Sequence, residues 1–240
     1  MKKIYKENHE AKMSIIEHLV ELRERILIAF LVFFIITILC LIYSKDLTVI
    51  LQAPASGIKF LQLAPGEYFF VSIKIALYSG IILSSPFSIY QIIRFIMPGL
   101  TEREGQYIIP ILITSIILFF TGILFSYKIL IPMTLKFLIK YGSDIVEPIW
   151  SLEEYFNFIS LVLFSTGLSF QIPILQILLG LIKIVRWEQM IKYWKNIVFL
   201  STIVGAIITP STDPLTQILM TTTIMILYLS GILALKVINK

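Results

Sequence analysis

Three glutamates near the start of the chain share one face of a predicted helix. Glu17, Glu21 and Glu24 are spaced four and three residues apart, so a helix brings them together on successive turns. An apolar stripe occupies the opposite face and consists of Ile15, Leu19, Leu22 and Ile26. Arg25 follows Glu21 by four residues, which allows an ion pair within the helix. By itself the stretch favours a solvated helix on a membrane surface. The alternative is a carboxylate face that binds a cationic partner.

A second pair of carboxylates, Glu102 and Glu104, follows a Pro98-Gly99 turn. Thr101 and Glu104 have the spacing of a capping box, which gives Glu104 a structural role as one interpretation. The other interpretation places this pair on the same membrane face as the first cluster. Two carboxylate clusters on one surface suit paired guanidinium groups, because a carboxylate accepts two parallel hydrogen bonds from an arginine.

Membrane spans must position these groups. Of the 240 residues, 58% are hydrophobic and only 15% are charged, which is unlike a soluble domain. Six stretches with almost no charge predict six transmembrane helices. Their ranges are about 26–43, 70–93, 107–130, 156–181, 196–209 and 215–235. We therefore predict an all-α, polytopic membrane protein with a single domain, residues 1–240. Residues 1–25 form its amphipathic N-terminal segment, and the fifth span is the shortest.

The basic residues predict the orientation. Most of the 20 Lys and Arg residues fall in the N-terminal segment, in the loops after the second and fourth spans, and at the C-terminus. Loops rich in Lys and Arg stay on the cytoplasmic side. Both termini are therefore predicted on the cytoplasmic or stromal side. We attribute the net charge of +5 to this topology and not to nucleic-acid binding.

No motif in the sequence predicts an enzyme. His9 and His18 lack the spacing of metal ligands, and we find no nucleophile motif or phosphate-binding loop. The single cysteine, Cys40, lies in the first span and is expected to pack against apolar neighbours. We expect no catalytic residue, no metal and no cofactor.

Prolines within the spans leave a small-solute secondary transporter open as an alternative function. Pro86 is expected to kink or interrupt the second span, and Pro173 lies in the fourth. Broken helices are typical of such transporters, although these spans carry almost no charge. Gln171, two residues before Pro173, fits either a hydrogen bond to a neighbouring helix or a contact with a partner protein.

Several segments, in their order along the chain, resemble the TatC family, the receptor subunit of the twin-arginine protein translocase. These segments are residues 18–25, 90–104, 119–127, 167–173 and 208–217. Residues 59–70 are similar to the cyanobacterial and plastid branch. The resemblance implies a glove-shaped bundle of six helices without enzyme activity. It also implies transport of folded cargo, driven by the proton motive force, across a plastid thylakoid membrane or else a bacterial membrane.

The resemblance also implies partners and site residues. The partners are twin-arginine signal peptides of folded cargo, single-span TatA/TatB-type subunits, other TatC copies and the lipid bilayer. Signal-peptide binding is assigned to Glu21, Glu104, Arg23, Phe95, Glu17 and Glu102. Docking of partner subunits is assigned to Thr209, Gln217 and Gln171. A structural loop role is assigned to Pro54, Pro98 and Asp213.

Two departures from the family pattern change what we expect. Gly105 stands where many members have Arg, which alters the charge balance beside Glu104. Gln171 stands where many bacterial members have Glu, and a neutral amide cannot carry a proton across the membrane. Separately, the short fifth span is expected to thin the bilayer locally and to recruit partners there.

Overall fold

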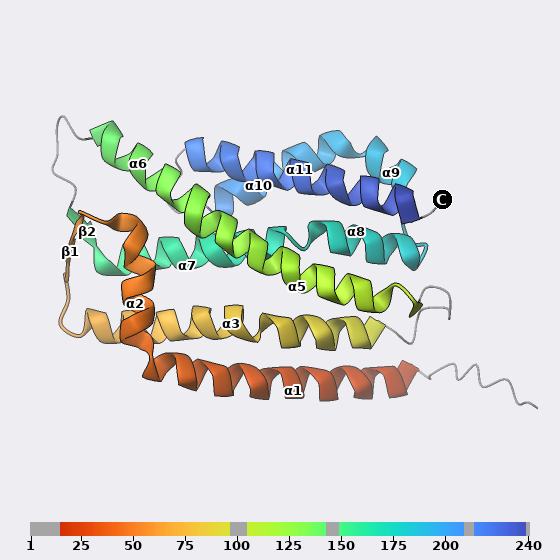
Figure 1. Cartoon of the computed structure of the whole chain (residues 1–240), viewed down its shortest axis with the longest axis horizontal. Coiled ribbons are helices and arrows are strands. Elements are labelled where there is room, and N and C mark those ends of the chain that lie inside the picture. Colours follow the sequence, from red (N-terminus) through yellow and green to blue (C-terminus); the bar gives the residue numbers. More distant parts are fainter. Residues whose placement is uncertain (1–14, 97–104, 143–148, 209–213, 239–240) are drawn as a thin grey trace, which may run out of the picture.

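The computed structural model describes residues 15–96, 105–142, 149–208 and 214–238, and almost all of them are helical (Figure 1). The helices are α1 (Ile15–Ile42), α2 (Ser44–Gln52), η1 (Ala53–Ala55), α3 (Glu67–Ile96), α5 (Ile108–Phe125), the π-helical turn η3 (Ser126–Leu130), α6 (Ile131–Gly142), α7 (Leu152–Ser169), α8 (Ile172–Leu181), α9 (Trp187–Lys192), α10 (Trp194–Ile208) and α11 (Pro214–Ile238). The two short strands are β1 (Lys59–Leu61) and β2 (Ile149–Ser151).

The described residues contain five helical segments long and apolar enough to cross a membrane, plus one shorter apolar helix. The long segments are Ile16–Ile42, Glu67–Ile96, Ile108–Tyr141, Leu152–Leu181 and Pro214–Ile238, and the shorter one is Trp194–Ile207. This confirms the all-α polytopic class and the short fifth span. The start of α1 and the end of α11 lie at one end of the bundle, called here the terminal end; β1 and β2 mark the opposite sheet end (Figure 1).

Helix α1 packs against the rest of the bundle mainly through α3 (Figure 1). Gly80 of α3 allows the close approach, because a Cβ at this position would collide with Thr37 of α1. The predicted surface segment is not a separate helix: from Ile15 onward it forms the first turns of α1. Leu19 and Ile26 of its apolar stripe are exposed, as expected for side chains that face lipid.

We predicted that Pro86 would kink or interrupt the second span, and the interruption is wrong, because α3 continues through Pro86. A proline has no N–H, and it leaves the carbonyl four residues earlier without its helical donor. Here that carbonyl belongs to Ile82, and the Ser85 hydroxyl donates to it at 2.7 Å. The neighbouring serine therefore compensates for the bond that the proline removes.

The fourth span is interrupted instead. Helix α7 ends at Ser169 and α8 begins at Ile172, with Pro173 in the first turn of α8, where its missing N–H has no helical partner to lose. Helices α5 and α7 approach closely, because a Cβ on Gly167 would lie 3.0 Å from the Phe119 ring. The break therefore sits against α5.

Two segments between helices form an ordered cap at the sheet end. Strands β1 and β2 pair in parallel, with Phe60 opposite Trp150. Pro54 lies in η1, within the first of these segments. The largest apolar core lies beneath the cap, where α3, η3, α6 and α7 meet; its most deeply buried side chains include Val71, Ile75, Leu130, Ile131, Phe156, Ile159 and Val162.

Glu67, the first residue of α3, ties the two cap segments together. It is only 4% exposed. One carboxylate oxygen accepts the backbone N–H groups of Leu63 at 2.6 Å and Ala64 at 3.1 Å. The other accepts the N–H of Glu153 at 3.0 Å. A carboxylate can serve all these donors at once, because it has about four lone-pair sites and needs no proton.

We expect Glu67→Gln to loosen this cap. The amide keeps the volume but replaces one acceptor oxygen with a donor, so at least one backbone N–H loses its partner. The midpoint of thermal denaturation in detergent should fall by several degrees, and limited proteolysis should cut the cap sooner. Glu154→Gln is the matched control, since Glu154 is exposed one residue beyond Glu153. Equal midpoints for the two variants would show that Glu67 does not hold the cap.

Candidate functional site

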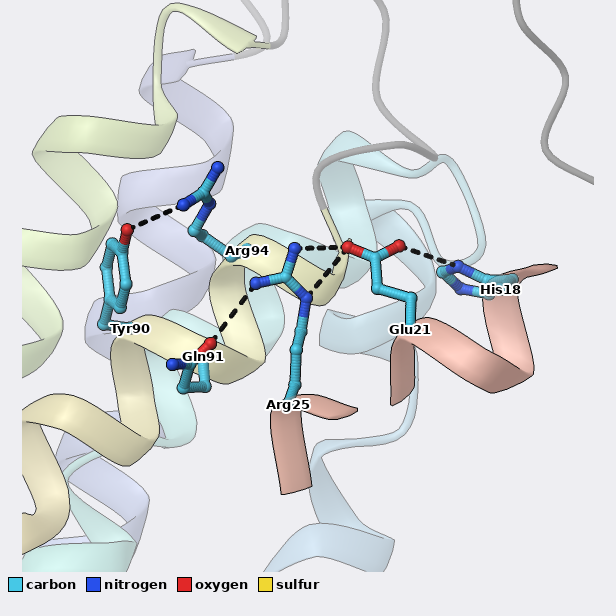
Figure 2. A network of polar contacts seen from close by, with 6 residues as sticks. All are labelled: His18, Glu21, Arg25, Tyr90, Gln91 and Arg94. Carbon is cyan, nitrogen blue, oxygen red and sulfur yellow. Dashed lines mark hydrogen bonds and ion pairs between the residues drawn. The ribbon is translucent and has the colours of Figure 1, made fainter. Parts of the chain in front are cut away.

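A polar network joins the first turns of α1 to the last turns of α3 at the terminal end (Figure 2). The Arg25 guanidinium donates from Nε to Glu21 Oε1 at 2.9 Å, and its Nη2 donates to the same oxygen. Its Nη1 donates to Gln91 Oε1 on α3 at 3.2 Å. The ion pair predicted from the i,i+4 spacing of Glu21 and Arg25 is confirmed, and Gln91 extends it across to the second helix.

This network is largely shielded from solvent. The exposed fractions of the Glu21 and Arg25 side chains are 17% and 19%, and Gln91 is buried. Ion pairs in such a setting are screened less than surface pairs. Arg25 Nε and Nη2 both donate to Glu21 Oε1, whereas Oε2 is enclosed and has no hydrogen-bond partner among the described residues. The carboxylate therefore keeps one acceptor oxygen unused.

His18 lies beside Glu21 Oε2 and stacks on Phe95. His18 Nδ1 lies 3.7 Å from Glu21 Oε2, which is too long for a hydrogen bond (Figure 2). The His18 ring stacks on the Phe95 ring of α3, with centroids 4.2 Å apart and planes 12° apart. Phe95 was predicted as a site residue, whereas His18 was noted only as lacking the spacing of a metal ligand. The spacing of His18 three residues before Glu21 was the available signal.

The other predicted signal-peptide residues fall into two groups. Glu17 and Arg23 are exposed on α1, and helix geometry turns Arg23 away from Glu21, because residues two apart do not share a face. Glu102 and Glu104 lie outside the described residues, as does Pro98. The structure thus brings together Glu21 and Phe95, and adds His18, Arg25 and Gln91.

The predicted docking residues differ in how much of their hydrogen-bonding capacity the chain itself uses. Gln171, in the break between α7 and α8, donates from Nε2 to the Ser115 carbonyl at 3.1 Å and accepts from the Ser115 hydroxyl. The bond to a neighbouring helix is therefore the confirmed interpretation of Gln171. Gln217 of α11 donates to the Thr202 carbonyl of α10 at 3.3 Å and is partly exposed. Thr209 and Asp213 lie outside the described residues.

The part of the chain that the structure describes contains no candidate metal site. No group of three or more His, Cys, Asp or Glu side chains there could hold a metal ion. The polar network instead has the chemistry of a guanidinium site: a shielded carboxylate, an aromatic and imidazole wall, and a neutral amide that accepts a hydrogen bond.

Comparison with known proteins gives a consistent result. The family model described as Sec-independent protein translocase protein (TatC) matches residues 17–222. A tatC-like protein, ycf43, of Gracilaria tenuistipitata var. liui is 63% identical over 97% of this chain and 98% of its own length. The chloroplastic Sec-independent protein translocase protein TATC of Arabidopsis thaliana is 45% identical over 92% of this chain and 66% of its own length.

A solved structure agrees in fold as well as in sequence. The crystal structure of the twin-arginine translocase receptor TatC superposes with a TM-score of 0.84, at 34% identity, and covers 93% of this chain and 100% of that one. The family model spans most of the chain, including the polar network and the break in the fourth span. The chain therefore belongs to the TatC family and is a non-enzymatic transport component of the twin-arginine translocase.

Proposed function

We propose that this chain is the signal-peptide receptor of the translocase and that Glu21 binds an arginine of the twin-arginine motif. The observation that carries the proposal is that Glu21 already holds a guanidinium, that of Arg25, in a shielded setting. The carboxylate also keeps Oε2 unused. A guanidinium that bonds both oxygens at once has the geometry that arginine forms with carboxylates.

Glu104 is the second carboxylate of the proposal, and Glu102, Glu17 and Arg23 complete the binding surface. The roles of Glu104 and Arg23 rest on the family resemblance, and those of Glu17 and Glu102 rest on the two carboxylate clusters in the sequence. His18 and Phe95 supply a flat wall, on which a guanidinium plane can stack. The terminal end is then the cytoplasmic or stromal side, in keeping with the excess of basic residues there.

We assign docking of the single-span subunits to α10 and α11, with Gln217 and Thr209 as contacts. We expect a smaller contribution of Gln171 to docking, because Ser115 already bonds both its Nε2 and its Oε1. The same contacts fill the break in the fourth span, so the structure offers no specific feature in favour of a solute transporter. Transport itself draws on the proton motive force, and we assign the chain to a plastid thylakoid membrane or else a bacterial membrane; the chloroplastic relative supports a plastid location.

Replacing Glu21 tests the receptor role directly. Glu21→Gln removes the charge and turns one acceptor oxygen into a donor, so a charge-assisted bond worth about 1.5–3 kcal/mol is lost. The dissociation constant for a synthetic twin-arginine signal peptide, measured on detergent-solubilised protein, should rise by about tenfold or more.

Glu188→Gln is the control for this substitution, since Glu188 is exposed on α9 at the same end of the bundle. It makes the same change of charge without touching the network. If both variants bind the peptide as tightly as the wild type, Glu21 is not the receptor carboxylate.

The two glutamines should separate docking from folding. Gln217→Leu should reduce crosslinking to a single-span subunit and leave the thermal midpoint nearly unchanged. Gln171→Leu should lower the midpoint, because an interhelical side-chain bond in a membrane contributes about 0.6–2 kcal/mol. Loss of crosslinking in Gln171→Leu at an unchanged midpoint would reverse these assignments.

The short span provides a further test. Helix α10 has 15 residues, which at about 1.5 Å per residue is shorter than a hydrocarbon core of about 30 Å. Inserting one apolar turn into α10 should reduce transport of a folded cargo, since the local mismatch with the bilayer disappears. The same insertion in the longer α11 is the comparison, and full transport by the α10 variant would show that the short span has no such role.

A further inference from the structure

Arg25 occupies the carboxylate that the proposed function reserves for cargo. Its Nε and Nη2 both donate to Glu21 Oε1, so an arginine of the chain itself makes the contact expected of a signal-peptide arginine (Figure 2). An incoming guanidinium and Arg25 compete for the carboxylate of Glu21, whose side chain is 17% exposed. Any cationic ligand of Glu21 must therefore displace or share this contact.

The internal contact is incomplete in a way that favours exchange. Among the described residues, Glu21 Oε2 has no hydrogen-bond donor, and a shielded acceptor without a partner is unfavourable. A guanidinium that enters with two parallel N–H groups can satisfy both oxygens. It thus forms a bond that Arg25 does not make. The exchange gains a hydrogen bond at Oε2, which offsets the loss of the internal pair.

The displaced arginine also has a place to go. Arg25 Nη1 already donates to Gln91 Oε1 on α3 at 3.2 Å, and its long side chain has rotatable bonds to follow that contact. Gln91 is neutral, so it can hold Arg25 without competing for the ligand's positive charge. Arg94, one turn from Tyr90, is separately occupied: it donates to the Tyr90 hydroxyl at 3.0 Å and does not reach Glu21 (Figure 2).

We propose that Arg25 is an internal competitor for Glu21 and thereby sets the affinity that a ligand needs to bind the site. When an arginine of the signal peptide binds Glu21, Arg25 leaves the carboxylate and stays bonded to Gln91. This proposal rests on the proposed function, because it assumes that Glu21 binds the signal peptide. A competitor raises every ligand's dissociation constant by one common factor. Weak cationic segments then fall below a useful affinity, whereas a segment with two arginines still binds.

The test uses the full chain in detergent and two synthetic signal peptides, one with twin arginine and one with twin lysine. Arg25→Gln should lower the dissociation constants of both peptides by the same factor, about five- to tenfold, because the Glu21 carboxylate is then vacant for both. The ratio of the two dissociation constants should stay unchanged. Arg25→Lys keeps the charge without the planar fork, and should tighten both peptides by less.

Arg94→Gln is the matched control, since it removes one positive charge from the same end of the bundle, on α3 instead of α1. If the two arginines only repel the cationic peptide, both glutamine variants bind the peptide more tightly by the same factor, and this gain disappears at high salt. Displacement of a competitor tightens binding only in Arg25→Gln and persists in salt.

Three results would overturn the proposal: weaker binding in Arg25→Gln, a changed ratio between the peptides, or equal effects of the two glutamine variants. If Arg25→Gln fails to fold, unchanged binding by Arg25→Lys would overturn it equally. Failure of the proposed function looks different, because Glu21→Gln would then bind the twin-arginine peptide as well as the wild type does.

Discussion

A carboxylate inside a helical bundle must find hydrogen-bond donors, and two glutamates of this protein meet that requirement differently. Glu67 is buried at the sheet end, and both of its oxygens accept backbone N–H groups. Glu21, at the terminal end, accepts through one oxygen, and its other oxygen has no hydrogen-bond partner in the described part of the chain. A fully bonded carboxylate gains nothing from a ligand, whereas a partly bonded one does. The first therefore has the chemistry of a structural element and the second that of a binding site.

Two of the intramembrane glutamines, Gln171 and Gln217, differ in a similar way. Gln171 exchanges two hydrogen bonds with Ser115, so its Nε2 and its Oε1 are each bonded between α5 and the break in the fourth span. Gln217 donates once, to the Thr202 carbonyl, and remains partly exposed between α10 and α11. Hydrogen bonding therefore distinguishes these two side chains, although both are predicted docking residues on the family resemblance.

Periodicity and local spacing predicted much of the fold, and long-range contacts account for what they missed. Apolar runs located the spans, and the i,i+4 spacing gave the Glu21–Arg25 pair. The Arg25–Gln91 bond joins residues 66 positions apart, and the His18–Phe95 stack likewise joins α1 to α3. Pro86 alone predicts a break, but the hydroxyl of Ser85 replaces the missing bond. Such compensation depends on a rotamer and is not visible in residue types.

Helix α3 links the two carboxylates mechanically. Glu67 begins it, and Gln91 and Phe95 lie in its last turns. Because the helix continues through Pro86, the distance from the cap to these residues is fixed by the rise of the helix, about 1.5 Å per residue. Arg25 holds α3 through Gln91, and α1 meets the bundle mainly along this same helix. A shift of α3 along its axis at the sheet end would therefore change the contact between Gln91 and Arg25, which links the cap to the geometry of the polar network.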